Sequence, residues 1–140
     1  MKGNEWFACI SYGALDILIP QSDILESFYA PSEEPLSWEK HAEVFSIDRC
    51  VENLFGIRTD SVPTSRMLVK SNEVLVARTG RTPQVIQMDF STFHICKGVV
   101  GKKLFSKGLL AIRFEGNRIQ YLVNINALSE ASVQVRGGGL

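Results

Sequence analysis

The sequence has few residues of the kinds that build disulfide frameworks and metal sites. Its 140 residues include three cysteines, Cys9, Cys50 and Cys96, and two histidines. The cysteines are odd in number and far apart, and none belongs to a C-x-x-C pair. The sequence therefore predicts neither a disulfide framework nor a zinc site. Unpaired thiols are typical of proteins in a reducing compartment, and we expect a cytoplasmic protein.

Motifs that would indicate catalysis are also missing. His41 and His94 lie far apart and outside any H-E-x-x-H pattern, and no G-x-S-x-G motif supplies a serine nucleophile. His94 stands among apolar residues, which favours a structural role for it. The adjacent carboxylates Glu33 and Glu34 lie in a proline-containing segment, where solvation is the simpler interpretation. The sequence thus predicts no catalytic residue, no metal ligand and no cofactor.

The chain also has no net charge and no long hydrophobic run. Lysine plus arginine equals aspartate plus glutamate, at 15 each, so no overall attraction to nucleic acid or to anionic lipid is expected. No stretch reaches the ~18 apolar residues of a membrane span, and Ser11, Gly13 and Asp16 interrupt the apolar N-terminal segment. We therefore expect a protein that does not insert into membranes.

What the sequence does contain is apolar alternation. Hydrophobic residues make up 45% of the chain and charged residues 21%, which suits one globular domain of this length. Apolar residues repeat with period two far more often than with the helical period, which predicts a mainly β fold. Strands are expected at residues 6–12, 15–19, 44–47, 67–69, 74–76, 86–90, 110–114 and 119–125.

Three short helical stretches are expected between these strands. Ser22 is expected to cap a turn at residues 23–28, and Asn126 a final turn that ends at Leu128. Asp48 is expected to cap the third helix, which Gly56 ends. Loops are expected at residues 30–40, 58–66 and 97–108. A hairpin followed by a short polar-capped segment occurs twice, which suggests two small β-barrel-like subdomains.

The loop predicted at residues 97–107 is a candidate phosphate-binding site. Its Gly98-Val99-Val100-Gly101 run resembles the G-x-x-G clamp of KH domains, which grips nucleic-acid phosphates. That clamp needs a helix on each side, whereas β-structure is expected here. Four lysines in a loop are also typical of a solvated surface. Nucleic-acid binding therefore stays an alternative function, and its contacts would be Lys102, Lys103 and Lys107.

Aromatic residues supply a second candidate site. Phe28, Tyr29 and Trp38 flank or lie in a proline-rich segment, and exposed aromatic side chains often anchor protein interfaces. They are candidate protein-binding residues. The alternative is that they pack onto the core as a lid.

The order of these elements resembles the CheW-like domain, the adaptor fold of bacterial chemotaxis. The segments that carry the resemblance are Phe-Ala-Cys-Ile-Ser-Tyr-Gly at 7–13, Ile-Leu-Ile-Pro at 17–20, Ile-Leu-Glu at 24–26, Val-Phe-Ser-Ile-Asp at 44–48, Leu-Phe-Gly at 54–56, Val-Ile-Gln-Met-Asp at 85–89 and the final hairpin and turn at 110–128. One feature of that family is missing. Its Asn-Leu-Arg-Gly-like turn precedes the central strand, but residues 38–43 contain neither arginine nor glycine.

The resemblance implies a single CheW-like domain over residues 1–136, made of two intimately packed β-subdomains. The glycine run at residues 137–139 predicts a flexible tail over residues 137–140. It also implies a non-catalytic adaptor or scaffold in chemotaxis-type signal transduction. Its partners would be a CheA-type histidine kinase, a chemoreceptor, or both.

Overall fold

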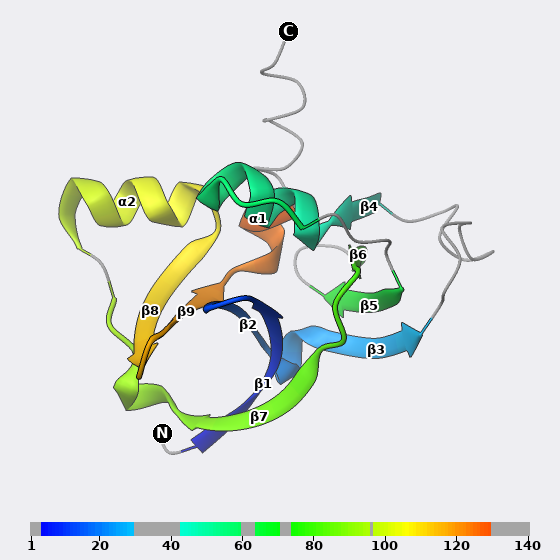
Figure 1. The fold of residues 1–140 in the computed structure, drawn as a ribbon, viewed down its shortest axis with the longest axis horizontal. Helices are drawn as coiled ribbons and strands as arrows, with labels where there is room; N and C mark the ends of the chain where they lie inside the picture. Colours follow the sequence, from blue (N-terminus) through cyan, green and yellow to red (C-terminus); the bar gives the residue numbers. More distant parts are fainter. Residues whose placement is uncertain (1–3, 30–42, 60–63, 71–73, 96, 130–140) are drawn as a thin grey trace, which may run out of the picture.

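The computed structural model describes residues 4–29, 43–59, 64–70, 74–95 and 97–129, and it is mainly β (Figure 1). The strands in these ranges form two sheets, and two short α-helices lie against them. No helix in the described part of the chain is long and apolar enough to cross a bilayer. The elements are β1 (Asn4–Tyr12), β2 (Leu15–Pro20), η1 (Gln21–Asp23), β3 (Ile24–Tyr29), β4 (Glu43–Ser46), α1 (Ile47–Phe55), β5 (Ser65–Lys70), β6 (Val74–Thr79), β7 (Gln84–Asp89), η3 (Phe90–Thr92), α2 (Gly98–Ser106), β8 (Leu109–Glu115) and β9 (Arg118–Val123).

The larger sheet has five strands in the order β7-β1-β2-β9-β8 and curls strongly (Figure 1). Strands β2 and β9 are parallel, and the other neighbours are antiparallel. The curl brings the segment after β7 against β8. There the His94 amide donates to the Ile112 carbonyl at 2.7 Å, and the Ile112 amide donates to the His94 carbonyl at 2.9 Å. This isolated bridge joins the two ends of the sheet without a continuous ladder.

The smaller sheet has four strands in the order β3-β5-β6-β4, with β4 and β6 parallel. The prediction of a mainly β fold with two barrel-like subdomains and a few short helices is therefore confirmed. Neither sheet closes into a complete barrel.

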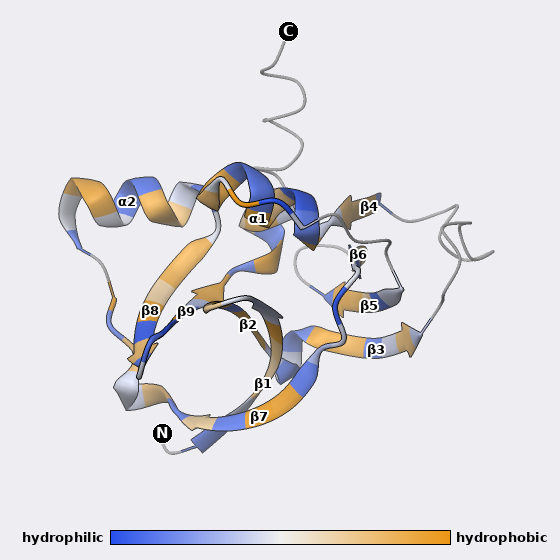
Figure 2. Cartoon of the chain, viewed as in Figure 1, coloured by the Kyte–Doolittle hydropathy of each residue, from blue (hydrophilic) through white to orange (hydrophobic). Residues whose placement is uncertain are grey.

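The core consists of two clusters that share strands β1 and β2. Because side chains alternate across a strand, one face of each strand can enter each cluster. Ile17 and Ile19 enter the larger cluster, between the two sheets and α1, whereas Leu18 enters the smaller cluster inside the curl. Figure 2 shows hydrophobic residues along the strands and alternating hydrophobic and hydrophilic bands on both helices.

Helix α1 forms where the sequence predicted it, but its N-cap is different. The Ser46 hydroxyl accepts a hydrogen bond from the Arg49 amide at 3.1 Å, so Ser46 is the cap. Asp48, the expected cap, lies in the first turn and is 6% exposed. Gly56 ends the helix with a φ of 69°, as expected.

The helical turns expected at residues 23–28 and before Leu128 differ from the structure. Residues 23–28 do not form a helical turn, since most of them belong to β3, which pairs antiparallel with β5. Strand pairing across the chain has overridden the local capping signal. The final turn forms, but Asn124 caps it, because the Asn124 side-chain oxygen accepts from the Ala127 amide at 2.9 Å.

The prediction of a loop that carries the lysines is wrong, because residues 98–106 form α2. Local sequence gives this helix little support. Lys97 stands at the N-cap without a side-chain cap, and two glycines and two valines lower helix propensity. Packing supplies the missing stability, since Leu104 lies against the larger core cluster.

Gly108 joins α2 to β8 at a point of close approach. Its φ is 92°, and a Cβ atom there would lie 2.7 Å from the backbone N and Cα of Leu128. Gly116, in the turn of the last hairpin, also has a positive φ, of 58°, but a Cβ there meets nothing within 4 Å.

We therefore expect Gly108→Ala to destabilise the fold much more than Gly116→Ala. Gly116→Ala should lower the free energy of unfolding only by the cost of a left-handed backbone, about 1 kcal/mol. Gly108→Ala adds a clash with backbone that cannot move aside, for a total loss of about 3 kcal/mol. Urea denaturation measures both losses. Equal losses in the two variants would contradict the close approach at Leu128.

Candidate protein-binding groove between the two sheets

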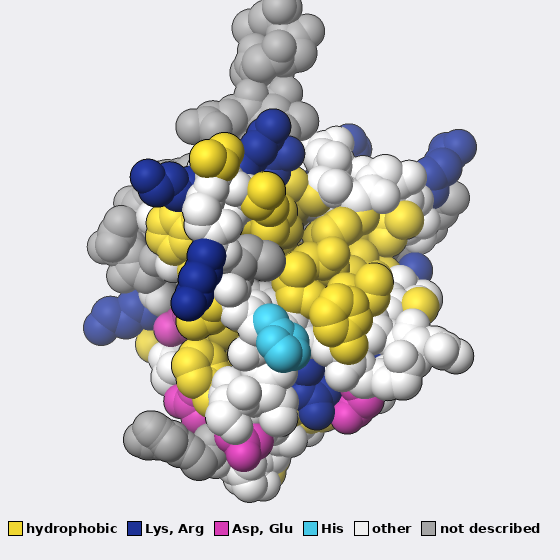
Figure 3. All heavy atoms as spheres, turned by 90° about the vertical axis from the view of Figure 1, so that its left-hand side faces the viewer, with side chains coloured by type: hydrophobic (Ala, Val, Ile, Leu, Met, Phe, Trp, Pro, Cys, Tyr) yellow, Lys and Arg dark blue, Asp and Glu magenta, His cyan; other side chains and the backbone are white. Residues whose placement is uncertain are grey.

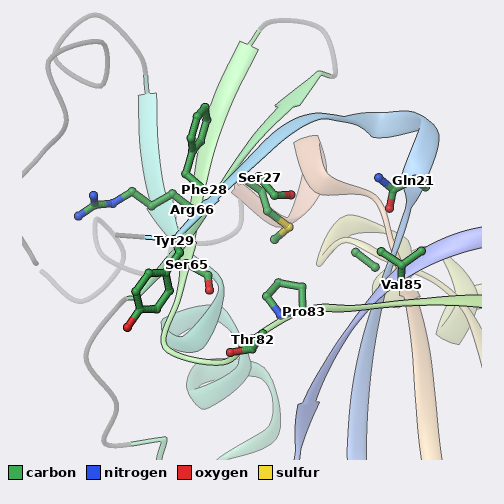
Figure 4. A pocket seen from close by; sticks show the side chains of 11 residues that line it. Gln21, Ser27, Phe28, Tyr29, Ser65, Arg66, Thr82, Pro83 and Val85 are labelled. Atoms are coloured by element: carbon green, nitrogen blue, oxygen red, sulfur yellow. The ribbon is translucent and has the colours of Figure 1, made fainter. Parts of the chain in front are cut away.

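A groove of about 260 Å³ lies where the two sheets meet (Figure 4). Ala8 of β1 and Val85 of β7 contribute to its wall from the larger sheet. The other wall comes from β3 and β5 in the smaller sheet. Gln21 of η1 and the connection between β6 and β7 supply the rest. The residues that Figure 4 labels are Gln21, Ser27, Phe28, Tyr29, Ser65, Arg66, Thr82, Pro83 and Val85.

Strand register sets the position of these walls. Ala8 and Val85 are directly opposite each other in the β1–β7 pair. In the β3–β5 pair, Phe28 lies opposite Arg66 and Tyr29 opposite Ser65. Each wall is thus an antiparallel pair, which holds the lining side chains on rigid backbone.

The groove exposes apolar surface that the core does not use. Tyr29 is 75% exposed and Val85 is 60% exposed. Trp6 lies two residues before Ala8, so its side chain is on the same face of β1, and it is 52% exposed. Large apolar and aromatic side chains at the edge of a depression are typical of protein interfaces.

The Gln21 side chain contributes a buried polar atom to the groove lining. The Gln21 side-chain oxygen is buried and accepts no hydrogen bond from the described residues. Buried acceptors are nearly always satisfied, so an unpaired oxygen of this kind is uncommon in a folded protein.

The structure brings together two of the candidate residues named from the sequence. Phe28 is half-buried and Tyr29 is exposed, and they point in opposite directions from β3 in Figure 4. Tyr29 does not pack down as a lid. Trp38 lies outside the described residues. Lys102 and Lys103 are on α2 and Lys107 follows it, on the other side of the molecule from β3 (Figure 1).

Sequence reasoning missed Gln21, Pro83 and Val85. No local pattern marks them, because the groove exists only where segments far apart in sequence meet. Val85 could be assigned to a strand from the sequence, but not to an exposed position beside β3.

A buried hydrogen-bond network fixes the connection that lines the groove. The Tyr12 hydroxyl of β1 donates to the Asp48 carboxylate of α1. The Thr79 hydroxyl, at the end of β6, and the Gly80 amide donate to the same carboxylate, each at 2.8 Å. Burial, and then the negative charge of Asp48, raise the pKa of Tyr12. The network thereby holds both sheets and α1 to residues 79–80, just before Thr82 and Pro83.

A second polar cluster lies inside the curl of the larger sheet, beside a cavity of about 610 Å³. Arg118 donates two hydrogen bonds to Asp16, and Gln120 and Ser11 donate one each, at 2.9 and 2.7 Å. Burial alone would raise the pKa of Asp16, but these hydrogen bonds outweigh it and hold the pKa below its usual value.

These contacts satisfy the Asp16 carboxylate within the chain, so we interpret the cluster as structural. Nearby, burial and then the Asp16 charge raise the pKa of the Cys9 thiol. Within the described ranges, no three His, Cys, Asp or Glu side chains gather where they could hold a metal ion.

The Asp48 network generates a stability prediction. Tyr12→Phe removes the hydroxyl that donates to a buried carboxylate, and we expect a loss of about 2 kcal/mol. Tyr121→Phe is the matched control. Tyr121 is half-buried, and its ring packs on Phe55 with centroids 4.8 Å apart, so its loss should be within about 0.5 kcal/mol. Chemical denaturation of both variants tests this difference, and equal stabilities would refute it.

The Asp16 cluster generates a pH prediction. Because the folded-state pKa of Asp16 is lowered, its stabilising contribution is present above the ordinary carboxyl pKa of about 4 and is lost as pH falls below it. Arg118→Gln removes two of the hydrogen bonds to Asp16. The variant should therefore be less stable than wild type at neutral pH, and its free energy of unfolding should fall less on acidification. Lys102→Gln, which removes one exposed charge, should keep the wild-type slope. Denaturation midpoints from pH 7 downward give both curves, and parallel curves for wild type and Arg118→Gln would argue against the pairing.

Comparison with known proteins gives a structural match and no sequence match. No protein-family model matches the sequence, and no curated protein sequence matches it. The structure is similar to that of the scaffolding protein TtCheW from Thermoanaerobacter tengcongensis, with a TM-score of 0.59 and 9% sequence identity. The alignment covers 86% of this chain and 84% of TtCheW. The fold of this chain is therefore CheW-like, as the order of its sequence segments predicted.

Proposed function

We propose that this chain is a non-catalytic adaptor in chemotaxis-type signal transduction. Its partners would be a CheA-type histidine kinase, a chemoreceptor, or both. The CheW-like fold supports the proposal, since the similar structure is that of a scaffolding protein. Fold likeness alone does not specify function, so the argument rests mainly on the groove between the sheets.

The groove is the observation that carries the proposal. Both sheets contribute to its walls, and Tyr29 and Val85 expose most of their apolar surface beside it. A partner segment that covers these side chains gains the hydrophobic free energy of burial. With a volume of about 260 Å³, the groove is smaller than the pockets of about 300 Å³ or more that usually hold small-molecule ligands.

The lining also indicates the kind of segment that fits. An apolar side chain of the partner would enter between Tyr29 and Val85. An adaptor of this kind transmits signals through contacts.

Charged substitutions in the groove test this proposal. Tyr29→Asp and Val85→Asp place a carboxylate where an apolar contact is expected, and each should weaken partner binding about tenfold or more. Leu25→Asp is the control, because Leu25 is on the same strand as Tyr29 and is 48% exposed but does not line the groove.

The probes are the purified cytoplasmic fragment of a chemoreceptor and the CheA-type kinase of the same organism, titrated by calorimetry. Loss of affinity in both groove variants, with the Leu25 variant unaffected, would support the proposal. Absence of binding to both probes by the wild-type protein would refute it, as would binding that neither groove substitution weakens.

A further inference from the structure

Helix α2 presents a second surface that neither the core nor the groove explains. Val99 is 84% exposed, Val100 is 65% exposed and Phe105 is 54% exposed. Only Leu104 anchors the helix to the larger core cluster. The exposed part of these side chains adds no burial free energy to the fold, and valine is a poor helix former, so the stability of α2 does not account for their exposure.

The charges around α2 are of one sign. From Phe90 to Phe114 the chain carries four lysines, one arginine and no carboxylate, although the whole chain is neutral. Arg113 donates hydrogen bonds to the side chains of Glu115 and Gln120. The four lysines, by contrast, take part in none of the ion pairs between described residues. They are Lys97, Lys102, Lys103 and Lys107, and all are exposed.

Helix stability does not account for all of these lysines. Lys103 and Lys107 lie near the C-terminal end of α2, where a positive charge is favourable. Lys97, however, lies at the N-terminal end, where a positive charge is unfavourable, and no acidic residue stands in the first turn to offset it.

Lysines and apolar side chains are interleaved on this surface. Residues three or four apart are neighbours on a helix, so Val99 lies beside both Lys102 and Lys103, and Phe105 lies beside Lys102. Figure 3 shows this side of the molecule, with basic and hydrophobic side chains interspersed in its upper part and acidic ones lower down. A helix that lies in a membrane surface separates its apolar face from its basic face. Interleaving fits a protein interface, in which apolar contacts are surrounded by charge pairs.

We infer that the exposed face of α2 is a second protein-docking surface, which binds an acidic amphipathic segment of a partner. Apolar side chains of that segment cover Val99 and Phe105, and its carboxylates pair with Lys102 and Lys103. This surface is independent of the groove, because α2 and β3 lie on opposite sides of the molecule (Figure 1). One chain can therefore hold two partners at once, as an adaptor requires.

The test uses a labelled helical peptide with leucines on one face and glutamates along its borders. Its control is the same peptide with glutamine in place of glutamate. Fluorescence anisotropy should show saturable binding of the Glu peptide that weakens as salt rises, and much weaker binding of the Gln peptide. Lys102→Glu should weaken binding roughly tenfold, and Val99→Ser should weaken it several-fold.

Lys70→Glu is the matched control, because Lys70 is an exposed lysine on β5. A peptide with lysine in place of glutamate should bind the Lys102→Glu, Lys103→Glu double variant better than the wild type. Tyr29→Asp should leave binding of the Glu peptide unchanged, which separates this surface from the groove.

Equal binding of the Glu and Gln peptides would overturn the proposal, as would an unchanged affinity in Lys102→Glu. Tighter binding of phosphatidylserine vesicles or of a single-stranded oligonucleotide than of the Glu peptide would also overturn it, and would assign α2 to a membrane or to nucleic acid. Thermal melting of each variant confirms that it is folded.

Discussion

Strands β1 and β2 are buried on both faces, and the rest of the structure depends on this constraint. One face of the hairpin closes the cluster inside the curled sheet, and the other face closes the cluster shared with the smaller sheet and α1. A strand with two buried faces cannot slip by one residue without placing a polar side chain such as Asp16 in the apolar cluster between the sheets. The hairpin therefore constrains the register of the larger sheet and supplies one wall of the core between the two sheets.

The meeting of the sheets is then made rigid by the Asp48 carboxylate. A buried carboxylate is costly unless it is well hydrogen-bonded, and here donors come from β1, from the end of β6 and from the backbone of Gly80. Three separate elements must be correctly placed to satisfy one group. Thr82, which lines the groove, lies just beyond this network, so the network helps to hold that side of the groove in place.

Exposed apolar residues border the groove and also stand on α2, on the opposite side of the molecule. Tyr29 and Val85 border the groove, whereas Val99 and Phe105 stand among lysines on α2. The groove is built from rigid paired strands. Helix α2 is locally weak and is held by Leu104 and by the tight passage at Gly108. A rigid groove and a weakly anchored helix on a single chain would suit the proposed adaptor role, in which two contacts form independently.

Period-two alternation in the sequence alone determined most of the strands and the mainly β fold, because alternate side chains on these strands are apolar and enter the core. Apolar residues at helical spacing determined α1, and Gly56 determined where it ends. Tertiary structure decided everything that depends on contacts between distant segments. Strand pairing made residues 24–29 a strand, and core packing made residues 98–106 a helix against the local propensity of their glycines and valines. Phe28 and Tyr29 could be chosen from their chemistry, but Gln21 and Val85 could not, because a groove between two sheets leaves no mark on either segment alone.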